Sequence, residues 1–488
     1  MTTRAKQLWP GGSSAAREKG PIAAAIALLV FLGLFASAAS AQDVKTYTRQ
    51  TFDQWLEKNV NAKPDFKPGD VLTNKDIERM RPFIPPGYLE QLDFPDFKAT
   101  VIAPVDHTPR KDYQDCSAKH QNQTQLKSDG SMQNYVCGQP FLNSQITAGD
   151  PQAGMKAAWN FDHRWQNFGF LMSGGYATWD RFDGGTHTPV EYQQPPQEWT
   201  QAANLSASIG PTDTREIYGG GGTFQRSLGS FYSRVYYTDL AQMQDQGGVL
   251  PVSDAKDFFW KEFTGFFSPF DIRGTVFIVY RYADPTRADD AWAYIPNLRR
   301  VRRISAEVKS DSLLGTDHTI EDFYSFSGRP LEWNWKFLGW KDVLGVVDSK
   351  YDYTHLYGPK GIIPNDVWSL RRYAVIERTP KDPRHPYSSV VMFWDAQNWD
   401  AWLSFAWDKK GKLWKAWEFQ KKWSETFEAP ALAAINKGTN NTNFQSIQVL
   451  DLQNDRGTIW ICPGGYPTVD PKKVAALYDI NKLEEIHR

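Results

Sequence analysis

The sequence has little cysteine and almost no net charge. Among its 488 residues there are only three cysteines, and the formal net charge is -1. A near-neutral chain lacks the basic surface that binding to nucleic acid requires, so we expect no nucleic-acid partner. Apolar residues make up 41% of the chain and aromatic residues 14%, which excludes an intrinsically disordered protein.

Recognisable catalytic and metal-binding motifs are also missing. The eight histidines are scattered and form no HExxH or HxH pattern, and there is no CxxC, so we expect no metal and no cofactor. The glycine run 219–222 lacks the Lys-Ser/Thr of a phosphate loop, and no GxSxG elbow is present. The sequence therefore predicts a protein that is not an enzyme.

Long apolar runs are confined to the start of the chain. Four basic residues precede the run Ile22 to Phe35, and Ala39-Ser40-Ala41 follows it. This order is typical of a secretory signal peptide, so we expect residues 1–41 to be removed near Ala41 and the protein to be exported. An uncleaved membrane anchor is the alternative, because the run is nearly long enough to span a bilayer.

The three cysteines are Cys116, Cys137 and Cys462. Export would place them in an oxidising compartment, where Cys116 and Cys137 could close a short loop with a disulfide and leave Cys462 single. Three unpaired buried thiols are the alternative.

The pattern of residues predicts four regions. After the signal peptide, residues 42–149 are expected to form an irregular, proline-rich arm with short helices at 51–59 and 74–80. Residues 150–460 are expected to form the main domain, which opens with a helix capped by Asp150 and running to about Trp165. Residues 461–488 are expected to be a tail with a short helix.

The main domain is expected to be mainly β, of the α+β class. Alternating segments bounded by turns predict strands at 168–179, 214–223, 231–239, 274–282, 291–295, 299–305, 331–336, 372–378, 389–394, 399–407, 412–420 and 444–450. Many strands without intervening helices favour a mainly antiparallel sheet that curls into a barrel or half-barrel.

Tryptophan is the densest signal in the sequence. Seven lie close together: Trp394, Trp399, Trp402, Trp407, Trp414, Trp417 and Trp423. Packing in the core and contact with a ligand both remain open for them. For the cavity wall, alternation puts Val276, Ile278 and Tyr280 on one face of a strand and Phe277 and Val279 on the other. The expected ligand-binding residues are Phe277, Val279, Trp292, Tyr294, Trp333, Trp335 and Phe393.

Two charged groups also stand out. Four arginines, Arg299, Arg300, Arg302 and Arg303, follow an aromatic strand; we expect them to bind a partner or an anionic headgroup, although a solvated edge strand would show the same pattern. The tightest acidic group is Asp317, Glu321 and Asp322, and Asp395 and Asp400 flank a loop. Sequence spacing does not show whether two such carboxylates face a substrate, so a glycosidase stays open.

Several motifs in fixed order carry a family resemblance. They are Asp150 to Gly154, Ala157 to Phe161, Ser268-Pro269 with Arg273-Gly274, Trp292 to Arg303, Ser312 to Asp317, Glu321 to Phe323, Trp368 to Glu377 and Asp408 to Trp414. Together they resemble the bacterial family called domain of unknown function 1329, which is related to outer-membrane lipoprotein-sorting proteins. The arm around Cys116 and Cys137 and the tryptophans after Trp394 exceed the family pattern.

The resemblance implies a strongly curved antiparallel sheet or half-barrel that is closed by helices around an apolar cavity, as in lipoprotein carriers. It also implies a periplasmic carrier or chaperone for a lipid-like hydrophobic molecule. Its partners would be an inner-membrane exporter of the resistance-nodulation-division type or an outer-membrane protein, with peripheral membrane contact allowed. The alternatives are a secreted carbohydrate-binding protein or glycosidase, and an accessory subunit of an exporter that binds no ligand.

Overall fold

The computed structural model describes residues 47–181, 199, 218–220, 223–304, 310–462, 465–467 and 475–483. The expected signal peptide and most of the strand expected at 214–223 lie outside these residues. Within the described ranges, no helix is both long and apolar enough to cross a membrane.

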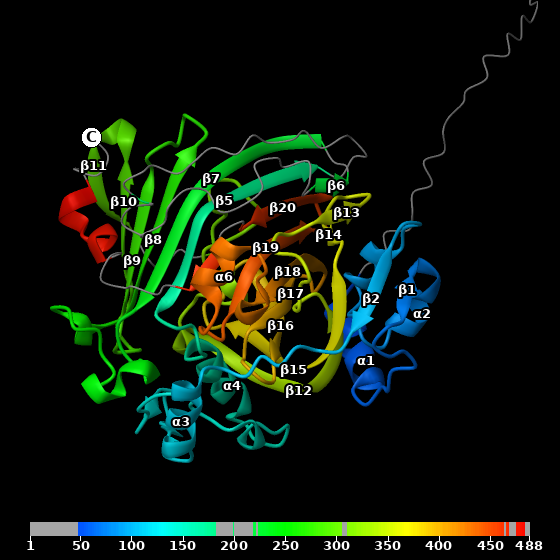
Figure 1. Cartoon of the computed structure of the whole chain (residues 1–488), viewed down its shortest axis with the longest axis horizontal. Helices are drawn as coiled ribbons and strands as arrows, with labels where there is room; N and C mark the ends of the chain where they lie inside the picture. The colour runs from blue at the N-terminus through cyan, green and yellow to red at the C-terminus, as the bar shows by residue number, and fades with distance from the viewer. Residues whose placement is uncertain are drawn as a thin grey trace, which may run out of the picture. The chain divides into compact units, whose positions relative to one another are not determined.

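One sheet of 16 strands dominates the fold (Figure 1). Its strands are β1 (Val71–Thr73), β2 (Lys98–Ile102), β5 (Gly169–Arg181), β7 (Thr223–Tyr236), β8 (Phe258–Ser268), β9 (Val276–Tyr282), β10 (Asp290–Ile295), β11 (Arg300–Ile304), β12 (Trp333–Gly345), β15 (Val367–Pro380), β16 (Tyr387–Asp395), β17 (Ala401–Asp408), β18 (Leu413–Trp423), β19 (Thr442–Asp451), β20 (Arg456–Ile461) and β21 (Gly465–Pro467). The expectation of a mainly β protein is confirmed.

The order of the strands follows the chain closely. The path runs β1-β2-β15-β16-β17-β18-β19-β20-β5-β7-β8-β9-β10-β11, with β12 beside β15 and β21 beside β5. Neighbours are antiparallel except β2 and β15, which are parallel. Figure 1 shows that β5 and β7 are long and strongly bent. In the described residues β1 and β11 end the path without pairing to each other, so the sheet is open.

Short elements complete the fold. The helices are α1 (Arg49–Asn59), α2 (Ile77–Met80), α3 (Lys111–His120), α4 (Ala153–Asp162) and α6 (Pro430–Asn436), and the small sheets contain β3 (Gln125–Leu126), β4 (Met132–Gln133), β6 (Tyr218–Gly220), β13 (Leu356–Gly358) and β14 (Ile363–Pro364). Helix α4 begins later than the sequence predicts. The side chain of Asp150 accepts a hydrogen bond from the backbone N–H of Gln152 at 2.8 Å and holds a turn that precedes the helix.

The region expected to be an irregular arm is part of the core. Its strands β1 and β2 extend the main sheet, and Phe52 and Trp55 of α1 are buried against β15 to β18. Proline and polar residues dominate its sequence, but its apolar side chains come at spacings that turns and short helices bring to one side. This region therefore covers a face of the sheet that would otherwise be exposed to water.

The tryptophans of β16 to β18 are core residues on both faces of the sheet. On one face, Trp402 and Trp407 pack against the N-terminal region, residues 47–102. The centroid of the Trp407 ring lies 5.4 Å from that of Phe52. On the other face, Trp394 stacks on Phe161 of α4 with ring centroids 4.2 Å apart. Six of the seven are buried, and Trp414 is partly exposed. Packing therefore accounts for this cluster.

Candidate functional site

The strands β7, β8 and β9 present one row of side chains to the interior. Their register places Tyr232 opposite Thr264, Thr264 opposite Phe277, and Glu262 opposite Val279. Because alternate residues of a strand share a face, these five side chains lie together. We call this the pocket face.

A segment without regular strands covers the pocket face. This covering segment, Ser312–Gly328, places Leu313, Ile320 and Phe323 against it. The Phe323 ring stacks on Tyr232 with centroids 5.4 Å apart. Between the segment and the strands lies a mainly apolar pocket of about 30 Å³, which also includes Met172 and Trp460. This volume has room for about one water molecule, since the covering segment fills the remaining space.

Three buried carboxylates anchor the covering segment to basic side chains, and the Arg378 guanidinium lies within 4.0 Å of two of them, Glu321 and Asp322. Asp317 Oδ1 lies 2.7 Å from Arg456 Nη2, Asp322 pairs with Arg378, and Glu321 Oε2 lies 3.0 Å from His385 Nε2. Further hydrogen bonds come from Thr458 to Asp317, from Tyr387 to Asp322 and from the Trp333 indole to Glu321. The acidic group seen in the sequence therefore holds the segment to the sheet.

Neighbouring cations and hydrogen-bond donors offset the unfavourable burial of these carboxylates. Burial raises the pKa of Asp322, but the Arg378 guanidinium and the Thr319 hydroxyl outweigh it, so the net pKa lies below its usual range. Two further buried carboxylates also form ion pairs. Asp395 Oδ2 lies 2.6 Å from Arg371 Nε, and Asp400 Oδ2 lies 2.8 Å from Lys421 Nζ.

His318 lies within the covering segment and has no polar partner. Its side chain is fully buried, and neither ring nitrogen has a hydrogen bond. The ring packs edge-on against Phe323 at 4.7 Å. Burial lowers the pKa of His318 to about 3, which keeps the ring neutral at ordinary pH.

A network of charged side chains closes one end of the pocket. Arg234 donates to Glu262 at 2.9 Å and to the Ser327 hydroxyl at 2.5 Å. Arg281 pairs with Asp289 at 2.9 Å and donates to the Gly328 carbonyl at 2.7 Å. Both arginines therefore tie the end of the covering segment to β7 and β9.

Beyond this network lies a second, larger cavity of about 210 Å³. Its wall mixes aromatic and charged side chains, including Tyr135, Trp159, His163, Phe259, Arg281 and Arg329. The His163 ring stacks on Phe259 at 4.8 Å. Burial lowers the pKa of His163, but Asp239 and Asp162 outweigh burial, so the net pKa is raised.

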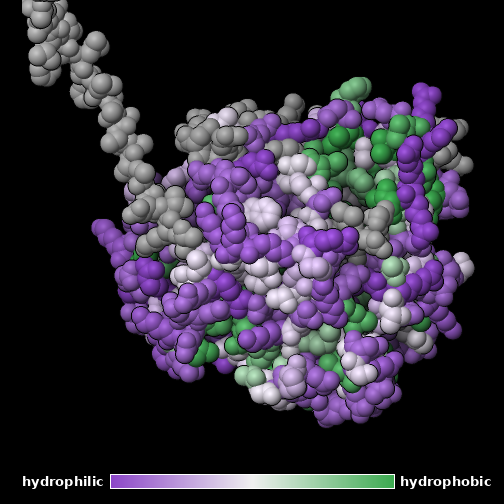
Figure 2. Space-filling model, turned by 180° about the vertical axis from the view of Figure 1, so that it is seen from behind, coloured by the Kyte–Doolittle hydropathy of each residue, from purple (hydrophilic) through white to green (hydrophobic). Residues whose placement is uncertain are grey.

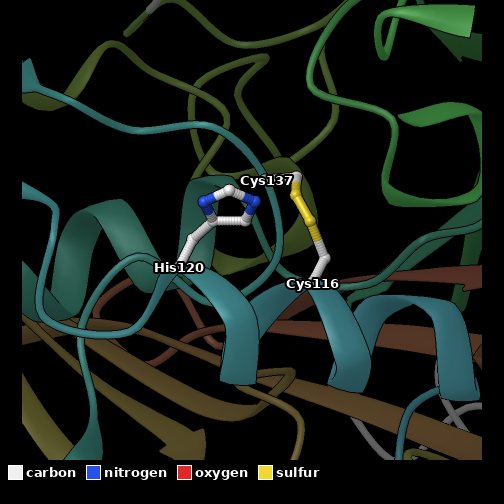
Figure 3. Close-up of side chains that lie close together, drawn as sticks. All are labelled: Cys116, His120 and Cys137. Atoms are coloured by element: carbon white, nitrogen blue, oxygen red, sulfur yellow. A yellow bond between two sulfur atoms is a disulfide. The ribbon is translucent and has the colours of Figure 1, made fainter. Parts of the chain in front are cut away.

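A disulfide joins α3 to the segment that follows β4. Cys116 of α3 and Cys137 are joined with Cα atoms 5.9 Å apart, and Cys462 is a free, buried thiol. Figure 3 shows the imidazole of His120 beside the disulfide, and the potential ligand atoms of the three residues lie within 4.8 Å of one another. Because the disulfide uses both sulfurs, this group offers a single ligand, which is too few to hold zinc.

The structure brings together only part of the predicted ligand set. Phe277 and Val279 line the pocket, whereas Trp292 and Tyr294 belong to the apolar cluster on the opposite face of the sheet. That face also carries Val276 and Ile278 and packs against the C-terminal Leu477 and Tyr478.

The other predicted residues lie around the covering segment or away from it. Trp333 donates to Glu321, and the Trp335 ring meets Phe326 edge-on at 4.9 Å. Phe393 faces α1, 6.2 Å from Phe52, because its neighbour Trp394 occupies the face toward the interior. Phe393 is thus outside the pocket lining.

The predicted arginines lie at an open edge of the sheet. Arg300, Arg302 and Arg303 are exposed on β11, and Arg299 is exposed in the preceding turn. Arg303 pairs with Asp290. Within the described residues, the other three form no ion pair and no side-chain hydrogen bond, so their charges face solvent.

Sequence reasoning missed β8 and its pocket residues Glu262 and Thr264. The segment 258–268 reads FFWKEFTGFFS, and its strand is buried on both faces, so alternation is hard to see. Its aromatic content and the Ser268-Pro269 turn that ends it were the available signals.

Comparisons with solved structures give distant likenesses. A putative outer membrane lipoprotein-sorting protein domain from Vibrio parahaemolyticus is 16% identical, with 69% of this chain and 100% of that chain covered and a TM-score of 0.40. A DUF1329 family protein from Desulfovibrio piger is 17% identical, with 68% and 99% covered and a TM-score of 0.42. A LolA superfamily protein from Nitrosomonas europaea is 11% identical, with 64% and 92% covered and a TM-score of 0.33.

No curated protein matches the sequence. The family model described as protein of unknown function (DUF1329) matches residues 71–476, which include the strands of the pocket face and the whole covering segment. The resemblance seen in the order of the sequence motifs is thereby confirmed, and the chain belongs to the DUF1329 family.

Proposed function

We propose that this protein is a non-enzymatic periplasmic carrier for a lipid-like hydrophobic molecule, which binds between the pocket face and the covering segment. The observation that supports this most is the nature of the cover. An apolar face of the sheet is closed by an irregular segment, and Leu313, Ile320 and Phe323 occupy the place that an apolar ligand would take. Such a concave, mostly apolar site with a few polar groups is typical of small-molecule binding.

Binding requires the covering segment to move. A pocket of about 30 Å³ is far too small for an acyl chain. The ligand would therefore replace Leu313, Ile320 and Phe323, while the carboxylate anchors keep the segment attached. Shielding about ten methylene groups gives roughly 8 kcal/mol, but the displaced side chains lose burial in exchange. We therefore expect the protein to bind its ligand reversibly and with weak to moderate affinity, as a carrier that must release its ligand requires.

The cellular location and the partners of the protein are inferred from its sequence. The signal-like start of the chain supports export to the periplasm, where a carrier could take its ligand from an inner-membrane exporter and deliver it to the outer membrane. In this proposal the protein supplies a shielded route between two membranes, and no bond is made or broken.

Carbohydrate binding or hydrolysis is supported less well. A glycan-binding groove needs exposed aromatic rings, yet the tryptophans of β16 to β18 are almost all buried. A glycosidase needs two carboxylates that face a substrate, whereas Asp317 and Asp322 pair with Arg456 and Arg378, and Glu321 contacts His385.

The test is uptake of a fluorescent fatty acid or sterol by delipidated protein. Val279→Asp puts a charge into the pocket and should abolish uptake, because that charge would have to lose water beside the ligand. Val301→Asp is the matched control: this valine is also half-buried on a strand near the sheet edge, but it does not line the pocket. Native mass spectrometry of protein from the periplasm would identify a natural ligand.

The proposal is wrong if both variants take up the probe like the unmodified protein. It is also wrong if the delipidated protein binds no such probe but binds or cleaves oligosaccharides, in which case the carbohydrate function replaces it.

A further inference from the structure

Two turns at one end of the sheet lie side by side. One joins β8 to β9, and the other joins β10 to β11 through Pro296–Leu298. The pairing of Val276 with Tyr294 aligns the strands just below these turns. A Cβ atom on Gly274 would lie only 3.1 Å from the Pro296 ring, so the two turns are in direct contact.

These turns expose apolar side chains to water. Phe270 is 90% exposed, Leu298 46% and Ile295 36%. They make up half of the exposed large apolar side chains in the described residues; the rest are dispersed on other elements, at Val71, Val136 and Tyr351. Figure 2 shows hydrophobic surface at the upper right, the end where β8 to β11 lie when Figure 1 is turned around.

The same turns and the edge strand are strongly basic. Within the described residues, four arginines there have no ion pair and no side-chain hydrogen bond: Arg273, Arg299, Arg300 and Arg302. Two more, Arg226 and Arg303, pair with Asp271 and Asp290. Among the described residues, these six arginines exceed the two aspartates that they meet by four charges, although the whole chain has a net charge of -1.

We propose that these turns dock the protein onto an anionic lipid surface. The apolar side chains project from the turns, and the soft interface of a bilayer accepts projecting side chains without a matching pocket, which a protein partner would have to supply. The guanidinium groups match the charge and geometry of lipid phosphates. The combination of inserted apolar residues and nearby cations is what holds peripheral proteins on membranes.

This docking does not depend on the proposed cargo. The Phe277 and Val279 side chains lie on the interior pocket face, whereas Phe270 and the free arginines are on the surface. Binding to a membrane can therefore be measured on protein without ligand, and uptake of a probe can be measured without a membrane. Failure of one proposal leaves the other standing.

The experiment is cosedimentation of the purified protein with vesicles. Vesicles of phosphatidylcholine alone are compared with vesicles that also contain phosphatidylglycerol, at low and high salt. We expect binding to the anionic vesicles that weakens as salt rises. Each arginine near the surface contributes about fivefold in affinity, so Arg300→Gln with Arg302→Gln should weaken binding by about 25-fold. Phe270→Ser should weaken it further.

Matched controls separate this surface from general charge and hydrophobicity. Lys409→Gln with Lys410→Gln removes two exposed cations elsewhere, and Val71→Ser removes an exposed apolar side chain elsewhere. Both should bind like the unmodified protein, and all variants should keep its melting temperature. Equal binding to neutral and anionic vesicles would overturn the proposal. So would equal losses in the test and control variants, or binding to an acidic membrane protein in detergent but not to vesicles.

Discussion

The neutral, unpartnered His318 should make the stability of the protein fall as the pH is lowered. The pKa of this imidazole is about 3 in the folded protein and 6.5 in an unfolded chain. Between these values the unfolded chain binds a proton that the folded protein excludes, so protons favour unfolding. The stabilising contribution is complete above the unfolded pKa and is lost as pH falls toward the folded pKa.

The size of the effect follows from this difference. One pKa unit corresponds to 1.36 kcal/mol, so the full loss is about 5 kcal/mol. From pH 7 to pH 5 the loss is about 2 kcal/mol, and by pH 4 it is about 3 kcal/mol. Asp322 and Lys415 are the charges that act on the ring, and they oppose each other.

The matched variant is His318→Phe, which keeps an aromatic ring against Phe323 and removes the titration. Urea unfolding of both proteins from pH 7 to pH 4 gives the difference in free energy of unfolding at each pH. Other groups titrate in both proteins and cancel in this difference. When the pH is lowered from 7 to 5, we expect the free energy of unfolding of the variant to rise by about 2 kcal/mol relative to that of the unmodified protein. A difference that does not change with pH would refute the reasoning.

Other predictions concern the anchors, the disulfide and a buried acid. Asp322→Asn should cost about 3–5 kcal/mol, because it removes the nearer carboxylate from the buried Arg378 guanidinium and leaves only Glu321 at 4.0 Å. Urea unfolding measures this cost, and an unchanged midpoint would contradict it. Replacing Cys116 and Cys137 by serine should lower the free energy of unfolding by about 3 kcal/mol in the same assay. In the unmodified protein, denatured without reduction, thiol counting should find one free thiol rather than three. Burial raises the pKa of Glu418 to about 8, so the contribution of this group to stability should fall as pH rises from about 4.5 to 8. The free energy of unfolding of the unmodified protein should therefore fall relative to that of Glu418→Gln over this range, and a difference that stays constant with pH would exclude the assignment.

Local patterns in the sequence predicted several features well. Alternation in 274–282 separated Phe277 and Val279 from Val276 and Ile278, and the structure places these pairs on opposite faces. The order of the motifs indicated the DUF1329 family, which the family model confirms. Both depend on residues close in sequence, or on their order, and therefore need no knowledge of contacts.

The residues that share the pocket could not be selected in this way. Phe393 and Trp394 are neighbours with similar character, yet Phe393 packs beneath α1 and Trp394 against α4. Either face of β16 could have been the interior one. The choice depends on where the N-terminal region and α4 lie, and those positions are set by contacts between residues hundreds of positions apart.

Spacing and composition were enough to predict the mainly β class, the family, the alternation of 274–282 and the arginines that follow the aromatic strand 291–295. The partners of Asp317, Glu321 and Asp322, and the packing of Ser312–Gly328 against the pocket face, become visible only in the folded protein. The physical reason is that a strand fixes which side chains share a face, whereas what covers that face depends on long-range packing.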